Sequence, residues 1–498
     1  METFQDAVVR LLAFQGQGVK RYAPLAFMVL GFAFLFLSSL GSHGGLMWDE
    51  AEYANLGRDI RLGREYGSHF RPPVLPLAVA AAMAVSGGEA DRVMKVPVAV
   101  AGLMGLALLY GFLSREFDRA TAIVGAGCLG AMPGYWIHTS FLLSEVPFLV
   151  FFAGAYLCFV KGLDGTSRWF FPAWAFTGLA FLTRYTCVLL GPLFVLSLIL
   201  EAVLDRKAVL GKLKDKRFWV APFLGLAIQL PWLIHQYSRH GDPLVGFRYA
   251  AGQLQNYAPD VSMPGYFYLA SMPSMLTLPI LGLVLLGIGW VLRTRNRVGL
   301  HLIMVAAFLL CWFSAYRYKE LRLITAILPF LAALAGLGYG RVVSRLWAEL
   351  SKPWAALLVV GLAAFYSNSL LTPYFQHNRV VGYPSLKQAA LGILPHCSED
   401  SVIMVAPSPQ FAWYSGKRTV GFPGPEQFYE KLAEVDFVVV VTYERGQPKY
   451  VGELVAKLFT EPEVEGHKYF VVADRFKNLT FVTSAAEFRQ RLRPPQAD

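Results

Sequence analysis

The segment that decides the fold is "YAPLAFMVLGFAFLFLSSL", Tyr22–Leu40, an apolar run followed almost at once by "MWDEAEYANLGRDI", Met47–Ile60. A run of about 20 apolar residues has the length of a membrane-spanning helix. It lacks the small-residue cleavage site of a secretory signal, and further apolar runs follow, so we expect a retained span. The charged stretch then places Asp49, Glu50 and Glu52 at a membrane boundary.

Composition extends this interpretation to most of the chain. Of the 498 residues, 55% are hydrophobic and 16% are charged, whereas soluble proteins average roughly 25% charged residues. Apolar runs of spanning length recur, which predicts a polytopic α-helical membrane protein with about eleven transmembrane helices. The predicted spans are Tyr22–Leu40, Val93–Leu113, Ala120–Ile137, Val146–Val160, Trp169–Leu182, Cys187–Leu204, Phe218–His235, Tyr266–Leu292, Gly299–Ala315, Leu323–Gly340 and Trp354–Leu371.

The chain changes character near Thr372, where polar residues begin to alternate with short strand-like and helix-like patterns. We therefore expect two domains: a multi-span domain over residues 1–371, with a first outer loop at 41–92, and a soluble α/β domain over residues 372–498. In the second domain the pattern predicts helices at 385–393, 410–414 and 450–459, and strands at 401–405, 437–441 and 469–472.

The net charge of +11 is explained by topology. Basic residues cluster in the breaks on one side of the predicted spans, and the positive-inside rule makes that side, with the N-terminus, cytoplasmic. The C-terminal domain is then expected on the extracytoplasmic side of the cell membrane. The positive net charge does not require a nucleic-acid partner to explain it. The apolar stretch Pro73–Ser86 is too short to span and is expected to lie along the outer surface or to be re-entrant. Four of the five cysteines fall in apolar segments, which excludes a disulfide framework and a CxxC metal site.

With this topology, ionisable residues from several separate breaks collect on the outer face, and such a cluster at a membrane boundary indicates a functional site. Structural roles stay open for three of them. Asp49 could be a helix N-cap with Glu52 completing a capping box, Glu145 could cap the next span, and Arg184 could snorkel to the interface. The candidate residues are Asp49, Glu50, Tyr53, His138, Glu145, Arg184, Lys319, Glu320 and Arg322.

The candidate residues fit group transfer from a phosphorylated lipid. A carboxylate can accept the proton of an attacking hydroxyl, and cations can hold a departing phosphate. The sequence contains no GxxxxGK, HExxH, CxxC or DxD motif, so nucleotide hydrolysis, zinc proteolysis and dithiol redox chemistry lack their usual signatures.

Three motifs in order resemble the GT-C glycosyltransferases, especially the protein O-mannosyltransferases and the lipid A aminoarabinose transferases. "WDEAEYANLGRDI" with "FRPPVLPL" is similar to their first outer loop, and "GLAFLTRYTCVLLGPL" matches a Gly-Leu-Ala-x-Leu-Thr-Lys/Arg segment at Thr183 and Arg184. "YKELRLITAILPFL" resembles the His-Lys-Glu-x-Arg-Phe signature of dolichol-pathway mannosyltransferases. The resemblance covers roughly the first 340 residues, with Tyr318 where that signature has His.

The resemblance implies a polyprenyl-phosphate-linked sugar donor, an inverting transfer on the outer face, and an acidic first-loop residue as the base. Carried over, Asp49 is the catalytic base and Glu50 its neighbour. Arg184, Lys319 and Arg322 would hold the lipid phosphate, with Glu145, Glu320, Tyr53 and His138 in substrate binding. A divalent metal at Asp49 and Glu145 stays open, and no other cofactor is implied.

The expected partners are the donor, membrane lipids and an acceptor that could be a protein, a glycolipid or a glycan. The main alternative is a polytopic transporter or flippase for a lipid-linked or phosphorylated substrate. A transporter would place its ionisable groups at mid-membrane and show paired repeats, whereas the charges here lie at the outer edge. An anchored surface-binding protein would need only one or two spans.

Overall fold

The computed structural model describes residues 23–42, 44–256, 262–381, 384–432, 434–441, 450–451, 468–472 and 479–480. The chain divides into two compact units. Unit 1 holds the described residues of Met1–Leu40, Gly67–Ser86 and Arg92–Pro373, and unit 2 holds those of Gly41–Tyr66, Gly87–Asp91 and Tyr374–Asp498. The first outer loop is thus divided, because its helix α2 (Trp48–Arg61) belongs to unit 2 while α3 (Val74–Ser86) belongs to unit 1.

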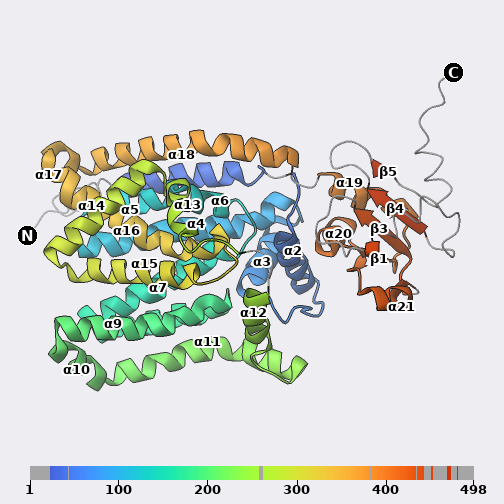
Figure 1. The fold of residues 1–498 in the computed structure, drawn as a ribbon, viewed down its shortest axis with the longest axis horizontal. Coiled ribbons are helices and arrows are strands. Elements are labelled where there is room, and N and C mark those ends of the chain that lie inside the picture. Colours follow the sequence, from blue (N-terminus) through green and yellow to red (C-terminus); the bar gives the residue numbers. More distant parts are fainter. Residues whose placement is uncertain are drawn as a thin grey trace, which may run out of the picture. The chain divides into compact units, whose positions relative to one another are not determined.

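Unit 1 is a bundle of helices (Figure 1). They are Ala23–Ser39, α3, α4 (Asp91–Glu116), α5 (Arg119–Ala131), α6 (Pro133–Thr139), α7 (Glu145–Asp164), α8 (Phe170–Phe181), α9 (Leu190–Leu204), α10 (Arg206–Lys214), α11 (Lys216–His240), α12 (Val245–Asn256), α13 (Phe267–Leu276), α14 (Leu278–Thr294), α15 (Arg297–Ser314), α16 (Leu328–Gly338), α17 (Ser344–Leu346) and α18 (Pro353–Val381). The first residue of α4, Asp91, and the part of α18 from Tyr374 onward belong to unit 2. Shorter turns of helix are η1 (Ser167–Trp169), η2 (Tyr185–Leu189), η3 (Leu321–Ile327), η4 (Tyr339–Val343) and η5 (Ala348–Ser351).

Among the described residues, seven helical stretches are long and apolar enough to cross a membrane, and nine if each of two bent pairs is one span. The pairs are α5–α6, bent by 62°, and α13–α14, bent by 114°. The other two predicted spans correspond to the helix Ala23–Ser39 and to α8, which has 12 residues. The prediction of a multi-pass helical membrane protein is confirmed.

The centre of unit 1 is α16, every residue of which is buried. It packs against α5, α14 and α15, while α7 packs against α8 and α8 against α11. A helix that is apolar on all sides is expected in the interior of a bundle. Small residues allow the closest contact: a Cβ added to Gly287 of α14 would lie 2.0 Å from the carbonyl oxygen of Leu334 in α16, so only glycine fits there.

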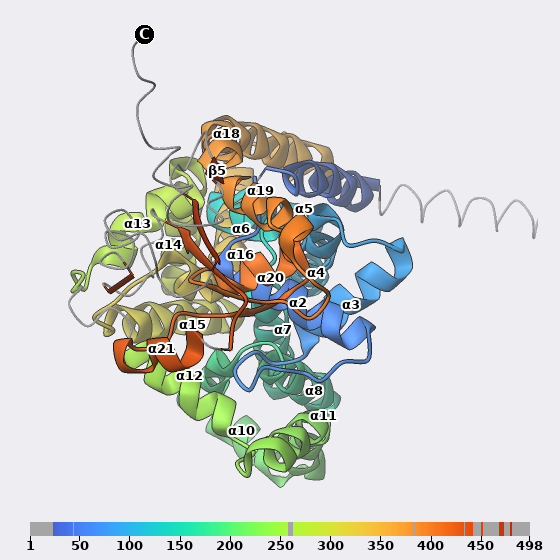
Figure 2. The same ribbon diagram turned by 90° about the vertical axis from the view of Figure 1, so that its right-hand side faces the viewer.

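The outer helices of unit 1 expose apolar side chains. On α11 these include Phe223, Leu230 and Ile234, and on α18 they include Leu362 and Phe365. The helix Ala23–Ser39 lies beside α18 in both views (Figures 1 and 2), where Phe27 meets Trp354 edge-on with ring centroids 6.2 Å apart. Exposed apolar surface of this extent indicates contact with lipid.

Unit 2 contains α2 and a small α/β layer. The other elements are α19 (Pro384–Gly392), η6 (Leu394–His396), β1 (Val402–Val405), α20 (Ser408–Ser415), β2 (Arg418–Val420), η7 (Pro425–Gln427), α21 (Phe428–Leu432), β3 (Phe437–Val441), β4 (Lys468–Val472) and β5 (Leu479–Thr480). The strand order is β2-β1-β3-β4-β5, and all neighbours are parallel except β4 and β5. The predicted α/β layer is confirmed, although most of the predicted helix at 450–459 lies outside the described residues.

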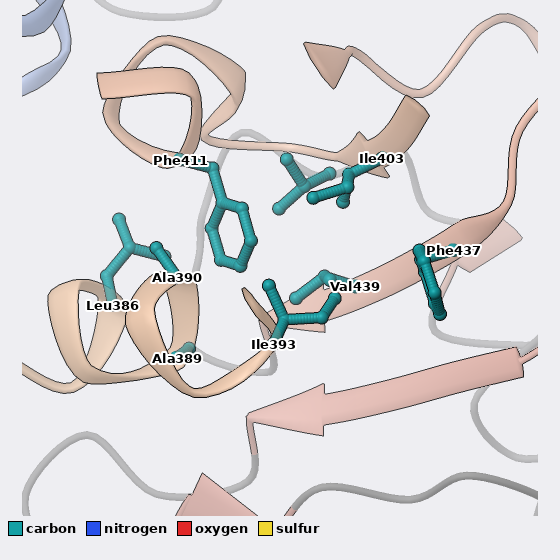
Figure 3. Packing of buried hydrophobic residues seen from close by; sticks show 9 residues of the cluster. Leu386, Ala389, Ala390, Ile393, Ile403, Phe411, Phe437 and Val439 are labelled. Carbon is teal, nitrogen blue, oxygen red and sulfur yellow. The ribbon is translucent and has the colours of Figure 1, made fainter. Parts of the chain in front are cut away.

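The two faces of this sheet bury different clusters. On one face, helices α19 and α20 pack Leu386, Ile393 and Phe411 against Ile403 of β1 and Val439 of β3 (Figure 3). The other face buries Met404, Phe428, Val438 and Val440. Alternate residues of β1 and β3 thus point to opposite faces, as strand geometry requires.

Candidate functional site

The first part of the site is the start of α7 in unit 1. The sequence "LLSEVPF" places Ser144 at the N-cap and Glu145 in the first turn, followed by a proline that this turn tolerates. Glu145 is 2% exposed. The unpaired N–H groups of a helix N-terminus favour a carboxylate nearby, so the first turn of α7 suits an acidic residue at position 145.

Arg184 lies at the break between α8 and η2, where the backbone is extended. Its Nη1 donates to Oε1 of Glu145 at 2.5 Å and to Oγ of Ser144 at 3.4 Å. The side chain of Arg184 keeps 23% of its surface exposed, whereas that of Glu145 is almost wholly covered. Arg184 therefore does not simply snorkel to an interface, because it is held by a carboxylate from a neighbouring helix.

His138 lies in the last turn of α6, after the bend between α5 and α6. Its Nδ1 lies 2.6 Å from the carbonyl oxygen of Gly134. The imidazole interacts electrostatically with Glu145, Arg184 and Arg322. Residues from three separate predicted outer breaks are therefore brought together in unit 1.

The segment "YRYKELR" also contributes to the site and ends at the start of η3. Lys319 is 3% exposed, and its ammonium donates to the carbonyl oxygens of Met263, at 3.0 Å, and Tyr316. The amide of Met263 in turn donates to the carbonyl oxygen of Arg317 at 3.0 Å. Lys319 thus joins its own turn to the segment before α13.

Glu320 organises the rest of this segment. Its carboxylate accepts hydrogen bonds from the Tyr318 hydroxyl, at 2.5 Å, and from the Arg322 guanidinium. Its carbonyl oxygen accepts one from the Tyr268 hydroxyl at 3.1 Å. Because η3 packs against α6, α7, α13 and α15, these contacts fix the position of Arg322 relative to His138. Sequence reasoning missed Tyr268 and Met263, since neither belongs to a motif.

The remaining candidates belong to unit 2 and lie on α2. The helix begins at Trp48, and the Glu50 carboxylate accepts a hydrogen bond from the Met47 amide at 2.9 Å. The N-cap hypothesis for Asp49 is therefore wrong: the N-cap is Met47, Asp49 occupies the second helical position and Glu50 the third. Glu52 accepts from the Trp48 indole at 3.1 Å instead of completing a capping box. Tyr53 is buried and Asp49 is half-buried.

The candidate metal ligands Asp49 and Glu145 belong to different units. Within the described part of the chain, no group of three or more His, Cys, Asp or Glu side chains is arranged to hold a metal ion.

Comparison with known proteins gives two kinds of match. A family model described as "Dolichyl-phosphate-mannose-protein mannosyltransferase" matches residues 70–235, which include His138, Glu145 and Arg184. A search of curated protein sequences found no match.

Solved structures match over most of the chain. ArnT from Cupriavidus metallidurans bound to undecaprenyl phosphate has a TM-score of 0.70 at 15% identity, covering 91% of this chain and 94% of that one. The apo form of the same ArnT has a TM-score of 0.68 at 16% identity, covering 90% and 93%. The Archaeoglobus fulgidus oligosaccharyltransferase in its apo form has a TM-score of 0.58 at 14% identity, covering 82% of this chain and 65% of that one.

At these identities the likeness concerns the fold. The chain is a multi-pass membrane protein with the GT-C fold of membrane glycosyltransferases. The resemblance indicated by the three sequence motifs is confirmed, and one third of the chain also matches the mannosyltransferase family model.

Proposed function

We propose that the protein is an inverting glycosyltransferase, which transfers a sugar from a polyprenyl-phosphate-linked donor to an acceptor hydroxyl on the outer face of the membrane. The observation that carries this proposal is the cluster of His138, Glu145, Arg184 and Arg322 within unit 1. It joins cations and a carboxylate from three separate breaks of the chain at the ends of membrane helices.

The charge of this cluster suits a phosphate. Arg184 and Arg322 are each paired with a carboxylate, Glu145 and Glu320. Lys319 donates to two neutral carbonyl oxygens and, within the described residues, forms no ion pair. The segment 316–322 therefore holds three cations, Arg317, Lys319 and Arg322, against one carboxylate, Glu320. Cations fixed in position before the reaction can stabilise a leaving phosphate without reorganising.

Asp49 is assigned the role of base. Asp49 lies in the first turn of α2 and does not occupy its N-cap position, which is Met47. In the proposed step, Asp49 takes the proton of the acceptor hydroxyl as its oxygen bonds to the anomeric carbon. The bond from that carbon to the lipid phosphate breaks, and the phosphate leaves with the electron pair. One displacement inverts the anomeric centre and needs only one base.

The comparisons support this donor class. A protein of the same fold binds undecaprenyl phosphate, and the matching family is described by a dolichyl-phosphate-linked mannose. Basic clusters in the breaks support a cytoplasmic N-terminus and an extracytoplasmic domain at 372–498. We leave the acceptor as a protein, a glycolipid or a glycan, since the described side chains do not distinguish them.

The test uses the full chain in lipid nanodiscs with a panel of polyprenyl-phosphate sugars and each acceptor class, and identifies the product by mass spectrometry. We expect transfer from at least one donor with inversion at the anomeric carbon. Asp49→Asn should lower turnover by about 10²–10⁴-fold, while Glu52→Gln on the same helix turn should not. Movement of intact donor across vesicles without sugar transfer would instead indicate a flippase and overturn the proposal.

A further inference from the structure

Within unit 2, helix α2 is packed against α20, although about 354 residues separate the contacting positions. Asn55 in the middle of α2 donates to the carbonyl oxygen of Pro409 at 2.8 Å. A 14-residue helix is marginal in isolation, so α2 depends on this packing for its order.

Arg58, near the end of α2, caps the C-terminus of α20. Its guanidinium donates to the carbonyl oxygens of Trp413, at 2.8 Å, and Ala412, at 3.3 Å. Its Cζ lies 3.9 Å from the centroid of the Trp413 ring. The last carbonyls of a helix lack partners and carry partial negative charge, which a cation satisfies. A cation–π contact adds to this. Glu89 holds the same guanidinium at 2.9 Å.

The other end of α2 is held by the next residue of α20. The amide of Leu46, three positions before Asp49, donates to the Tyr414 hydroxyl at 2.8 Å. That hydroxyl donates to Asp91 at 3.1 Å, and the Trp413 indole also donates to Asp91, at 3.2 Å. Both ends of α2 are therefore fixed by one turn of α20.

We propose that α20 positions Asp49. It does so through the contact of Trp413 with Arg58 of α2 and through the hydrogen bond of Tyr414 to the segment just before α2. This inference rests on the proposed function, since it concerns the orientation of the residue assigned as base. Arg58 lies nine positions beyond Asp49, about 14 Å along the helix, so it acts through the orientation of α2 and not on the reacting atoms. The C-terminal α/β layer then serves turnover directly, in addition to any contact with acceptors.

The test compares Arg58→Ala, Arg58→Lys and a control that weakens unit 2 elsewhere. Arg58→Ala leaves Glu89 paired with Arg61, so no carboxylate loses its last cation. Lysine can still pair with Glu89, but it lacks the fork that reaches two carbonyls. The control is Val438→Ala, because Val438 is buried on the sheet face opposite α20.

At a temperature where all variants remain folded, we expect Arg58→Ala to lower kcat at least tenfold with donor KM unchanged. Arg58→Lys should lie between it and wild type, and Val438→Ala should keep wild-type kcat. Hydrogen exchange should rise over residues 48–61 most in Arg58→Ala, less in Arg58→Lys and not in Val438→Ala. Wild-type kcat in Arg58→Ala, or unchanged exchange in α2, overturns the inference. If wild-type protein transfers no sugar, the proposed function fails, and the exchange data still report whether α20 holds α2.

Discussion

Nη1 of Arg184 lies 2.5 Å from Oε1 of Glu145, an ion pair that joins the break after α8 to the first turn of α7. Both residues lie in segments predicted to face outward, but nothing in their spacing predicts that they meet. Removing one partner of a buried pair leaves the other charge uncompensated, which typically costs about 3–5 kcal/mol.

This pair gives the first prediction. Arg184→Ala should lower the free energy of unfolding by an amount in the lower part of that range, because part of the Arg184 side chain is exposed. It should also raise donor KM at least tenfold, since a phosphate contact is lost. Thermal unfolding and steady-state kinetics measure the two effects. Arg248→Ala, which breaks an exposed pair with Asp242, is the control, and unchanged donor KM in Arg184→Ala would remove Arg184 from the donor site.

The buried ammonium of Lys319 gives the second prediction. Lys319→Met keeps a side chain of similar length but loses two hydrogen bonds to carbonyl oxygens. This loss should lower the free energy of unfolding by about 1–3 kcal/mol. It should also weaken donor binding, because a buried cation that forms no ion pair among the described residues is lost. Lys352→Met, at an exposed pair with Glu349, should change neither quantity. Tighter donor binding in Lys319→Met would contradict the assigned charge role.

The third prediction concerns a polar network inside unit 1 that the proposed mechanism does not use. Glu201 of α9 is fully buried and binds Arg297 and His301 of α15, with His301 Nε2 at 2.7 Å. We expect Glu201→Gln to lower the free energy of unfolding by about 3 kcal/mol and to leave the kcat of the folded fraction unchanged. Glu349→Gln is the exposed control. Full stability with lost turnover would show instead that the network takes part in function.

The fourth prediction is a pH dependence in unit 2. Burial raises the pKa of Asp59 above its ordinary value, more than Arg64 and Arg58 lower it. A carboxyl group with a raised pKa in the folded state destabilises that state at neutral pH, and this cost disappears as pH falls through the unfolded pKa near 4. Asp59→Asn should therefore stabilise unit 2 at pH 7 by less than about 1 kcal/mol.

Thermal unfolding of both proteins between pH 7 and pH 4 checks this expectation. The gap between Asp59→Asn and the parent should close as the pH falls. A variant that is less stable at pH 7 would mean that the contact with Arg64, at 3.8 Å, outweighs the cost of burial.

Much of the fold could be predicted because its signals are local. Apolar runs mark the long helices, and one Phe followed by four Val residues marks β3 at the predicted position. The bends between α5 and α6 and between α13 and α14 were not predicted, because each pair reads as one apolar run. The two-residue strand β5 is too short for any pattern.

The site was predictable in composition but not in its contacts. Motifs identified Glu145, Arg184 and Arg322, yet the N-cap of α2 lies two residues before the predicted one, at Met47. The acids at 49 and 50 look alike in sequence, and only the start of the helix places Asp49 at its second position and Glu50 at its third. The role of Arg58 depends on a partner at the far end of the chain, which no local pattern reveals.

The separation of about 354 residues between α2 and α20 also orders events during synthesis. Chains grow from the N-terminus and domains fold as their sequence emerges, so α2 is made early and lacks its packing partner until residues 408–415 have been added. All the candidate spans found among the described residues precede that point. The segment that carries Asp49 can therefore reach its final structure only when the membrane bundle has already been made, and a chain that stops before residue 408 should hold an intact bundle with an unfinished α2.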